Sequence, residues 1–321
     1  MAQVSYAAKV RLFLALATAL SLAAAGCSAE RPAQRPPASD DGRSPSAVVA
    51  ALRPLDACAL GATEGLTAVG LGPHRCRFDG QAGQDYLFLV IGAYMDAATR
   101  AASPPEEVAI DGARGWRRSL DTGCQMAVPV GADLVIRVSS LRGYKSPRPQ
   151  SHRCADATAA AGRVVERLGT PAAVSPRPPR RDACDLLDRA AGDHVRGLDL
   201  RFDEVNYGLD HCQARRTVPG GWSQEYSVQV RYGRADPRQK GTRQISVEGR
   251  AVTVAETSKD CEYGWAAEPS PVARPELSEI MVRLRAPDCA RAAELAPRVM
   301  RFYVTPPPEV APQSPIPLPH S

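Results

Sequence analysis

Short hydrophobic stretches with strand character recur at matching places in two parts of the chain. Residues 86–91 form a continuous apolar run, and their counterpart, residues 226–232, alternates strictly between polar and apolar side chains. Further along, residues 133–139 and 279–284 share a second apolar pattern. Runs of this length and alternation with a period of two are typical of strands. Each part is therefore predicted to contain several antiparallel strands.

A hairpin is predicted inside each part. Gly112 lies as many residues ahead of Cys124 as Gly249 lies ahead of Cys261. Each glycine is followed by a stretch with strand character, residues 116–120 and 251–257. Glycine between two such stretches is a common turn signal. The two hairpins are therefore expected to be equivalent.

Helices are predicted at both ends of each part. Asp56 and Asp182 stand two residues before a cysteine and ahead of apolar positions, as N-cap residues do. Alanine-rich segments follow Cys154 and Cys289 and read as helices. Pro297 is expected to kink or restart the second of these, because proline removes a backbone donor.

Eight cysteines follow the same repeat in two ordered sets of four. The middle gap is 48 residues in the first set and 49 in the second. The sets are Cys58, Cys76, Cys124 and Cys154, then Cys184, Cys212, Cys261 and Cys289. We interpret this as a duplicated domain, of class α+β, in which each copy is an antiparallel sheet with flanking N- and C-terminal helices and two disulfides.

Disulfides are the favoured use of these eight cysteines, although two other uses compete. Zinc sites and redox-active pairs both prefer cysteines spaced as Cys-x-x-Cys, which does not occur in this chain. His74 and His211 lie near cysteines, but their spacing does not recur at the others. Evenly distributed cysteines suit an exported protein with structural disulfides.

Duplication restricts the pairing to within each half, which leaves three patterns per half. First with second and third with fourth is the preferred pattern, since each bond would then staple a helix to the sheet. The predicted pairs are Cys58–Cys76, Cys124–Cys154, Cys184–Cys212 and Cys261–Cys289.

The ninth cysteine, Cys27, follows a stretch that has the three parts of an export signal. Lys9 and Arg11 precede an apolar run, and small residues follow it. Residues 24–27 resemble the lipobox of bacterial lipoproteins, although Ala24 stands where leucine is usual. The resemblance implies cleavage after residue 26 and attachment of lipid to Cys27. An ordinary secretory signal with an incidental cysteine is the alternative.

Proline-rich segments mark the expected boundaries. Residues 1–26 are the predicted signal peptide, 27–54 a lipidated flexible tether, 55–169 the first repeat, 170–181 a stiff linker, 182–304 the second repeat and 305–321 a disordered tail. Because the linker is expected to be stiff and extended, the two domains need not share a fixed interface. Its arginines, Arg177, Arg180 and Arg181, are expected to be solvated or to touch an anionic surface.

Composition excludes some partners. The formal net charge of +5 in 321 residues is too small a bias to indicate nucleic-acid binding. No segment after the signal is apolar enough to cross a membrane, so the membrane contact is expected to be the lipid on Cys27.

Recognised catalytic motifs are missing from the sequence. It has no Gly-x-Ser-x-Gly, His-Glu-x-x-His, phosphate loop or dinucleotide fingerprint. Carboxylates are numerous in the second half and are expected on solvated faces, although two could converge in a cleft: Asp185, Asp188, Asp199, Asp203 and Glu204. Trp116, Trp222 and Trp265 are expected to pack in cores, with a ligand groove as the alternative.

The Asp-x-Cys starts, the second cysteine at a strand and the lipoprotein signal resemble the secreted lipoprotein domains of unknown function of actinobacteria. The resemblance implies export, an α+β fold and a binding or sensor-like role, and it supplies no catalytic residue. We therefore expect a monomeric, non-enzymatic lipoprotein on the outer face of the cell membrane, with two modules for an unknown envelope ligand or protein and no cofactor or metal. A hydrolase with an unrecognised carboxylate pair and a structural partner of an envelope complex are the alternatives.

Overall fold

The computed structural model describes residues 44–81, 84–176, 178–179, 181–219, 221–235 and 241–305. The chain divides into two units, Met1–Pro36 and Pro37–Ser321, and all described residues belong to the second. The predicted signal peptide, the lipid-attachment residue Cys27, Arg177, Arg180 and residues 306–321 lie outside the described part. Within that part, no helix has the length and apolar character needed to cross a membrane.

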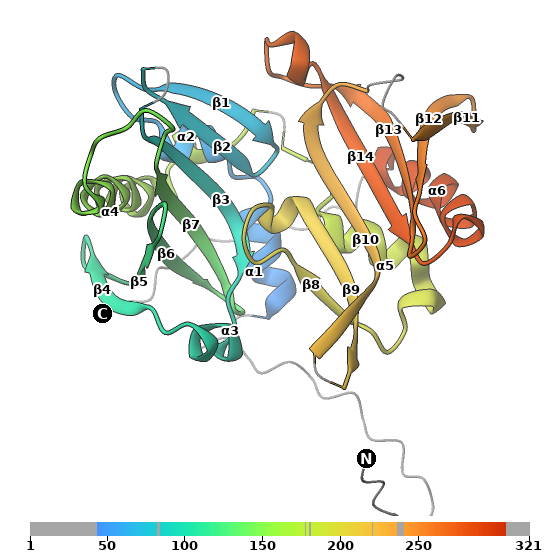
Figure 1. Cartoon of the computed structure of the whole chain (residues 1–321), viewed down its shortest axis with the longest axis horizontal. Helices are drawn as coiled ribbons and strands as arrows, with labels where there is room; N and C mark the ends of the chain where they lie inside the picture. Colours follow the sequence, from blue (N-terminus) through green and yellow to red (C-terminus); the bar gives the residue numbers. More distant parts are fainter. Residues whose placement is uncertain are drawn as a thin grey trace, which may run out of the picture. The chain divides into compact units, whose positions relative to one another are not determined.

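The first half is one seven-stranded antiparallel sheet with helices (Figure 1). Its helices are α1 (Pro45–Leu52), α2 (Ala57–Gly61), α3 (Ala97–Ala102) and α4 (Gln150–Arg167). Its strands, in chain order, are β1 (Thr67–Gly72), β2 (Arg75–Asp79), β3 (Tyr86–Tyr94), β4 (Glu106–Ile110), β5 (Ala113–Leu120), β6 (Gly123–Gly131) and β7 (Leu134–Leu141).

The second half is a second seven-stranded antiparallel sheet, between helices α5 (Ala183–Ala191) and α6 (Cys289–Val304). Its strands are β8 (Asp199–Phe202), β9 (His211–Val218), β10 (Gly221–Gly233), β11 (Thr242–Val247), β12 (Arg250–Glu256), β13 (Cys261–Pro269) and β14 (Glu279–Ala286). Short 3-10 helices lie at η1 (Pro171–Ala173), η2 (Gly192–Val195), η3 (Gly208–Asp210) and η4 (Pro275–Leu277).

The two sheets have the same strand order. The first runs β1-β2-β3-β7-β6-β5-β4, and the second, read from β8, runs β8-β9-β10-β14-β13-β12-β11. The register also matches, since the second cysteine of each half begins an equivalent row of paired residues. These rows are Cys76–Leu89–Val138 and Cys212–Val228–Leu284. The third cysteine lies two residues further along in both halves, Cys124 opposite Ser140 and Cys261 opposite Ala286. The α+β expectation and the similarity of the halves are therefore confirmed.

Each sheet is covered by helices on one face. In the first half α4 contacts β6 and β7, and α2 contacts β2 and β3. In the second half α6 contacts β13 and β14, and α5 contacts β9 and β10. Alternate strand residues point to that face and form the two main cores. The opposite faces carry the remaining residues, among them several arginines.

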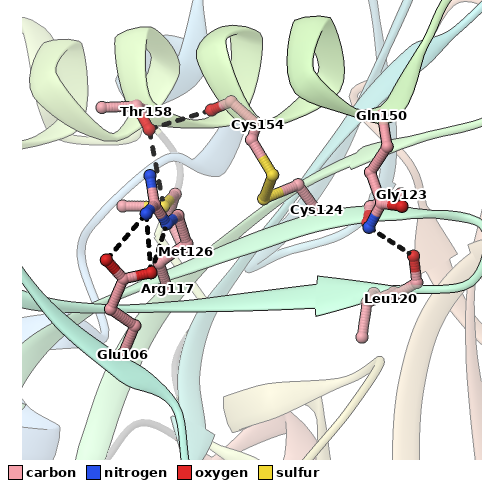
Figure 2. The surroundings of a disulfide bond; sticks show 9 residues. All are labelled: Glu106, Arg117, Leu120, Gly123, Cys124, Met126, Gln150, Cys154 and Thr158. Carbon is pink, nitrogen blue, oxygen red and sulfur yellow. Dashed lines mark hydrogen bonds and ion pairs between the residues drawn. A yellow bond between two sulfur atoms is a disulfide. The ribbon is translucent and has the colours of Figure 1, made fainter.

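Four disulfides join these helices to the sheets. They are Cys58–Cys76, Cys124–Cys154, Cys184–Cys212 and Cys261–Cys289, the pairs expected from the spacing. Figure 2 shows Cys124–Cys154, where Thr158 donates a hydrogen bond back to the Cys154 carbonyl oxygen at 2.9 Å and Gln150 donates to the carbonyl oxygen of Leu120 at 3.0 Å. Each bond fixes the start of a helix on a strand.

The predicted caps and turns are present. Asp56 accepts hydrogen bonds from the backbone of Cys58 and Ala59, and Asp182 accepts one from Asp185. The hairpins turn at Asp111-Gly112 and Glu248-Gly249, where all four residues have a positive φ of 47–79°. A two-residue turn of this kind needs positive φ at both positions, and glycine adopts it at no steric cost.

The predicted tether and linker boundaries need correction. Residues 45–52 of the tether form α1, because Val48 and Leu52 are fully buried in the first core. In the linker, Ala173 is buried and its carbonyl oxygen accepts a hydrogen bond from Asp56 N at 2.8 Å. Arg181 is also buried and pairs with Asp185 at 2.5 Å, so it is not solvated.

Two other expectations also change. Helix α6 runs from Cys289 to Val304 without a break at Pro297. Its apolar face, which includes Leu295, Ala296 and Val299, is fully buried and stabilises the helix despite the missing donor. The linker composition did not require an interface between the halves, and the structure shows one, because the halves share buried contacts.

Candidate functional site

The two halves are joined through a buried ion-pair cluster. His74 and Asp210 are 1% and 2% exposed, and His74 Nδ1 lies 2.8 Å from Asp210 Oδ1. Asp210 also accepts hydrogen bonds from Arg75 Nε and from the His74 backbone, both at 3.2 Å. The other ring nitrogen of His74 faces the Arg53 carbonyl oxygen at 2.9 Å. A buried carboxylate with this many donors is well compensated.

Equivalent positions of the two halves meet in this cluster. His74 stands two residues before Cys76, and Asp210 stands two residues before Cys212. The strand contacts follow the same pattern. Strand β3 contacts β8, and the counterpart of β3, which is β10, contacts the counterpart of β8, which is β1. A contact between like positions is the signature of two-fold packing. The interface is therefore pseudo-symmetric.

The segment before Cys212 also inserts an apolar side chain into the first half. Leu209 is fully buried and belongs to the first core. Gly92, at φ 71°, leaves space for it, because a Cβ at this position would lie 2.5 Å from Leu209 Cγ. The insertion fixes the second half against β3.

The loop next to β8 is ordered by one carboxylate. Asp203 Oδ1 accepts hydrogen bonds from the backbone N–H groups of Val205, Asn206 and Tyr207 at 2.6–2.9 Å. Burial raises the pKa of Asp203, but the hydrogen bonds from these amides and the nearby His211 outweigh it and hold that pKa well below its usual range. The loop thereby presents Glu204 at the edge of a crevice.

A crevice of about 460 Å³ lies between the halves. Helix α3 and β5 of the first half form one side, and strands β8, β9 and β10 form the other. Its chemistry comes from arginines, carboxylates and one tryptophan: Arg118, Arg201, Arg215, Asp96, Asp199, Glu204 and Trp222. Both halves contribute to this single site.

Most of the charges in the crevice are paired with one another. Arg201 binds Asp96 at 3.1 Å and also contacts Asp199. Arg215 binds Glu204 at 2.9 Å and donates two further hydrogen bonds to the Gln213 side chain. Desolvation raises the pKa of Asp96, but the hydrogen bonds of Thr99 and the charge of Arg201 lower it more. The Asp96 carboxylate is therefore held ionised.

Trp222 offers a flat surface at the rim. It is 54% exposed, and the Arg215 guanidinium lies 3.9 Å from its ring centroid. This cation–π contact holds the indole in place while leaving it open to solvent. Exposed tryptophans with a fixed orientation are common at binding surfaces.

Two further arginines on the first sheet form no ion pair with any described acid. Arg118 lines the crevice, and Arg137 is only 4% exposed on the same face of the sheet. The Nε atoms of both are buried without a hydrogen-bond partner. Burial, together with the charge of Arg118, lowers the pKa of Arg137 to about 10, although Asp203 and Glu204 act in the opposite direction.

A second hollow, of about 280 Å³, lies in the first half alone. It is lined by Asp85, Arg148 and Asp156, among others. These charges are largely paired, with Arg148 2.8 Å from Asp156 and Asp85 3.2 Å from Arg153. Its lining residues include no tryptophan.

The structure gathers some of the residues considered in the sequence and separates others. Asp199, Glu204 and Trp222 line the crevice, with Asp203 behind it. Trp265 is buried in the second core, Trp116 is half-buried on the first sheet and Asp185 pairs with Arg181 and Arg189.

The sequence analysis missed Arg118, Arg137, Arg201 and Arg215. They lie in four different strands, in a chain with 40 basic residues, so no local motif marks them.

Metal chemistry gains no support from the geometry. In the described ranges no three or more His, Cys, Asp or Glu side chains are grouped to hold a metal ion. The crevice is instead built from hydrogen-bond donors, paired charges and an aromatic face. No protein-family model, curated protein or solved structure matches this chain.

Proposed function

We propose that this chain is a lipid-anchored binding protein of the cell envelope that takes one small ligand in the crevice between its halves. Its two halves would be descendants of one duplicated domain, and Cys27 would carry the lipid. This differs from two independent binding modules, because the crevice needs residues from both halves.

Export is supported by the disulfides. All eight cysteines after Cys27 are joined in four bonds within the described part. Such bonds form and persist in oxidising compartments. Duplication is supported by the equal strand order and by the equivalent positions of the cysteines in the sheets.

Anchoring can be tested in cells. Cys27→Ser is expected to release the protein from the membrane fraction, and peptide mapping without reductant is expected to find the four bonds within the halves. A Cys27→Ser protein that stays in the membrane fraction would contradict lipid attachment at this residue. Free thiols, or bonds that join one half to the other, would contradict the export of two cross-linked copies.

The observation that supports binding is Trp222, an exposed indole held at the rim of a crevice of about 460 Å³. Binding is favoured over hydrolysis because the carboxylates there are engaged with arginines. Asp199 contacts Arg201 and Glu204 binds Arg215, so both carboxylates already have partners within the protein.

The test is a screen of the full exported chain in detergent against envelope lipids, glycans and peptides. Thermal shift and tryptophan fluorescence are the two readouts. A true crevice ligand is expected to raise the unfolding midpoint of the wild type and to lose this effect in Trp222→Ala. Tyr144→Ala is the matched control, because Tyr144 is an exposed aromatic residue, at 81%, that does not line the crevice. Absence of any ligand, or an equal response of both variants, would overturn the proposal.

A further inference from the structure

We infer that the crevice ligand carries a carboxylate or phosphate group and that Arg118 and Arg137 bind it. This inference rests on the proposed function and names the chemical class of the ligand. It starts from two cations on one sheet face that no described carboxylate neutralises.

Arg137 lies in the middle of the sheet, on the face opposite α2 and α4. Its neighbours across β3 and β6 are Val90 and Ala127, both apolar and buried. The residue is 4% exposed, and its Nε has no hydrogen-bond partner. Among the described residues, its guanidinium forms no ion pair. An unpaired buried cation is costly, so a counter-ion is expected.

In the second half, the arginine at the equivalent position is neutralised by a carboxylate. The register makes Arg283 the counterpart of Arg137, since Leu284 corresponds to Val138. Arg283 pairs with Glu262 at 3.2 Å. The residue in the first half that corresponds to Glu262 is Gln125, which is neutral. The first half therefore keeps the cation and lacks its carboxylate.

Arg118 adds a second cation beside it. In the strand register, Arg118 of β5 lies opposite Gln125 of β6. Gln125 in turn lies opposite Ser139 of β7, which is two residues from Arg137. Arg118 and Arg137 therefore share one face of the sheet. Arg118 donates to the Ser103 carbonyl oxygen but forms no ion pair in the described part of the chain. Arg118 also lines the crevice, whereas Arg137 is not among the lining residues and lies on the same sheet face.

The nearby acids are already engaged. Asp203 accepts three backbone hydrogen bonds, and Glu204 binds Arg215 at 2.9 Å. They act on Arg137 at longer range without forming an ion pair with it. Two guanidinium groups can bind the oxygens of a carboxylate or phosphate with strong, directional hydrogen bonds. The indole of Trp222 would contact the rest of the ligand.

Two variants separate a ligand site from a merely tolerated charge. Gln125→Glu gives Arg137 the internal carboxylate that Arg283 has, and Arg137→Met removes the charge among apolar neighbours. Without added anion, each is expected to raise the unfolding midpoint by about 2–4 °C. Each is also expected to weaken anion binding by about 30-fold or more. Arg283→Met is the matched control and is expected to retain the wild-type anion response.

The probes are inorganic phosphate and acetate, measured on the full exported chain against sodium chloride of equal ionic strength. Glucose 6-phosphate, glucuronate and glucose then distinguish a phosphate, a carboxylate and a neutral ligand. Stabilisation of the wild type by one anionic class, lost in Gln125→Glu and Arg137→Met, supports the inference. An equal response to glucose would overturn it while leaving crevice binding intact. Retained anion stabilisation in both variants, or a lower midpoint of Arg137→Met without anion, would also overturn it.

Discussion

The two halves are alike in their disulfide framework and differ most in the segment before the second cysteine. Cys58 and Cys76 are separated by 18 residues, whereas Cys184 and Cys212 are separated by 28. Strand order and register are nevertheless the same. The longer segment carries Asp203, Leu209 and Asp210, which order the crevice loop and fasten the halves together. The framework thus fixes the fold, while the added segment builds the interface and one side of the site.

The contact between equivalent positions refines this comparison. In a symmetric pair, His74 and Asp210 would be identical residues, and two like charges would meet in a buried place. The structure instead has a histidine opposite a carboxylate, 2.8 Å apart, which the proposed duplication explains by divergence of the two copies. Duplication within one chain permits such complementary pairs, which a homodimer cannot form at its axis.

The largest effect is expected from removing the carboxylate that joins the halves. Asp210→Ala leaves Arg75 and His74 buried without their partner. Breaking a buried pair in this way costs about 3–5 kcal/mol. Chemical denaturation should show this loss, and Asp210→Asn should recover part of it because the amide oxygen can still accept a hydrogen bond. A loss below about 1 kcal/mol, the value of an exposed ion pair, would contradict a buried junction.

A somewhat smaller effect is expected where the second half completes the first core. Leu209→Ala should cost about 3 kcal/mol, since a fully buried leucine leaves a cavity. The diagnostic readout is the region of the molecule in which hydrogen exchange increases. Hydrogen exchange should rise in β3, next to Gly92, although the substitution lies in the other half.

Leu187→Ala is the control for this variant. Leu187 is equally buried but belongs to the second core. Its substitution should raise exchange in the second sheet. If Leu209→Ala left β3 protected, the claim that the first core depends on the second half would be wrong.

Much of the framework could be predicted from the sequence because its signals are local. The Asp-x-Cys caps, the positive-φ hairpin turns and the cysteine spacing each act over a few residues or follow from the repeat. Residues 86–91 and 226–232 lie in the equivalent strands β3 and β10, but the irregularities of these two strands lie at different places. If Leu89 and Val228 are equivalent positions, the counterpart of Tyr86 is Glu225. Strand β10 has a bulge at this place, whereas the bulge of β3 lies at Gly92. Bulges leave no clear mark in an apolar pattern.

The site could not be predicted in the same way. Arg118, Arg137 and Trp222 lie on β5, β7 and β10, and only the packing of the halves brings the first and last to one crevice. The linker composition left the packing of the domains open. The contacts that order the linker, such as those of Ala173, come from residues that are remote in the sequence. Long-range packing of this kind overrides local composition.

Acid should weaken the loop that Asp203 orders beside the crevice. Because the folded-state pKa of Asp203 is depressed, its contribution to stability is fully present above its unfolded pKa, about 3.9, and is lost as the pH falls through the folded value. Asp203→Asn should cost about 2 kcal/mol at neutral pH, the value of hydrogen bonds to a charged group. The difference between wild type and variant in chemical denaturation should shrink below about pH 4. A difference that grew on acidification would contradict this assignment.

The smallest effect separates two caps that look identical in the sequence. Asp56 and Asp182 both cap the helix that carries the first cysteine of their half, but Asp182 also binds Arg53 of the first half at 2.7 Å. Asparagine caps a helix as well as aspartate does, so Asp56→Asn should change the free energy of unfolding very little. Asp182→Asn should cost about 1.5 kcal/mol, because it removes the negative charge that binds Arg53 in a largely buried ion pair. Equal effects of the two substitutions in chemical denaturation would mean that Arg53 and Asp182 contribute nothing to holding the halves together, which would leave Asp210 and Leu209 as the groups that do so.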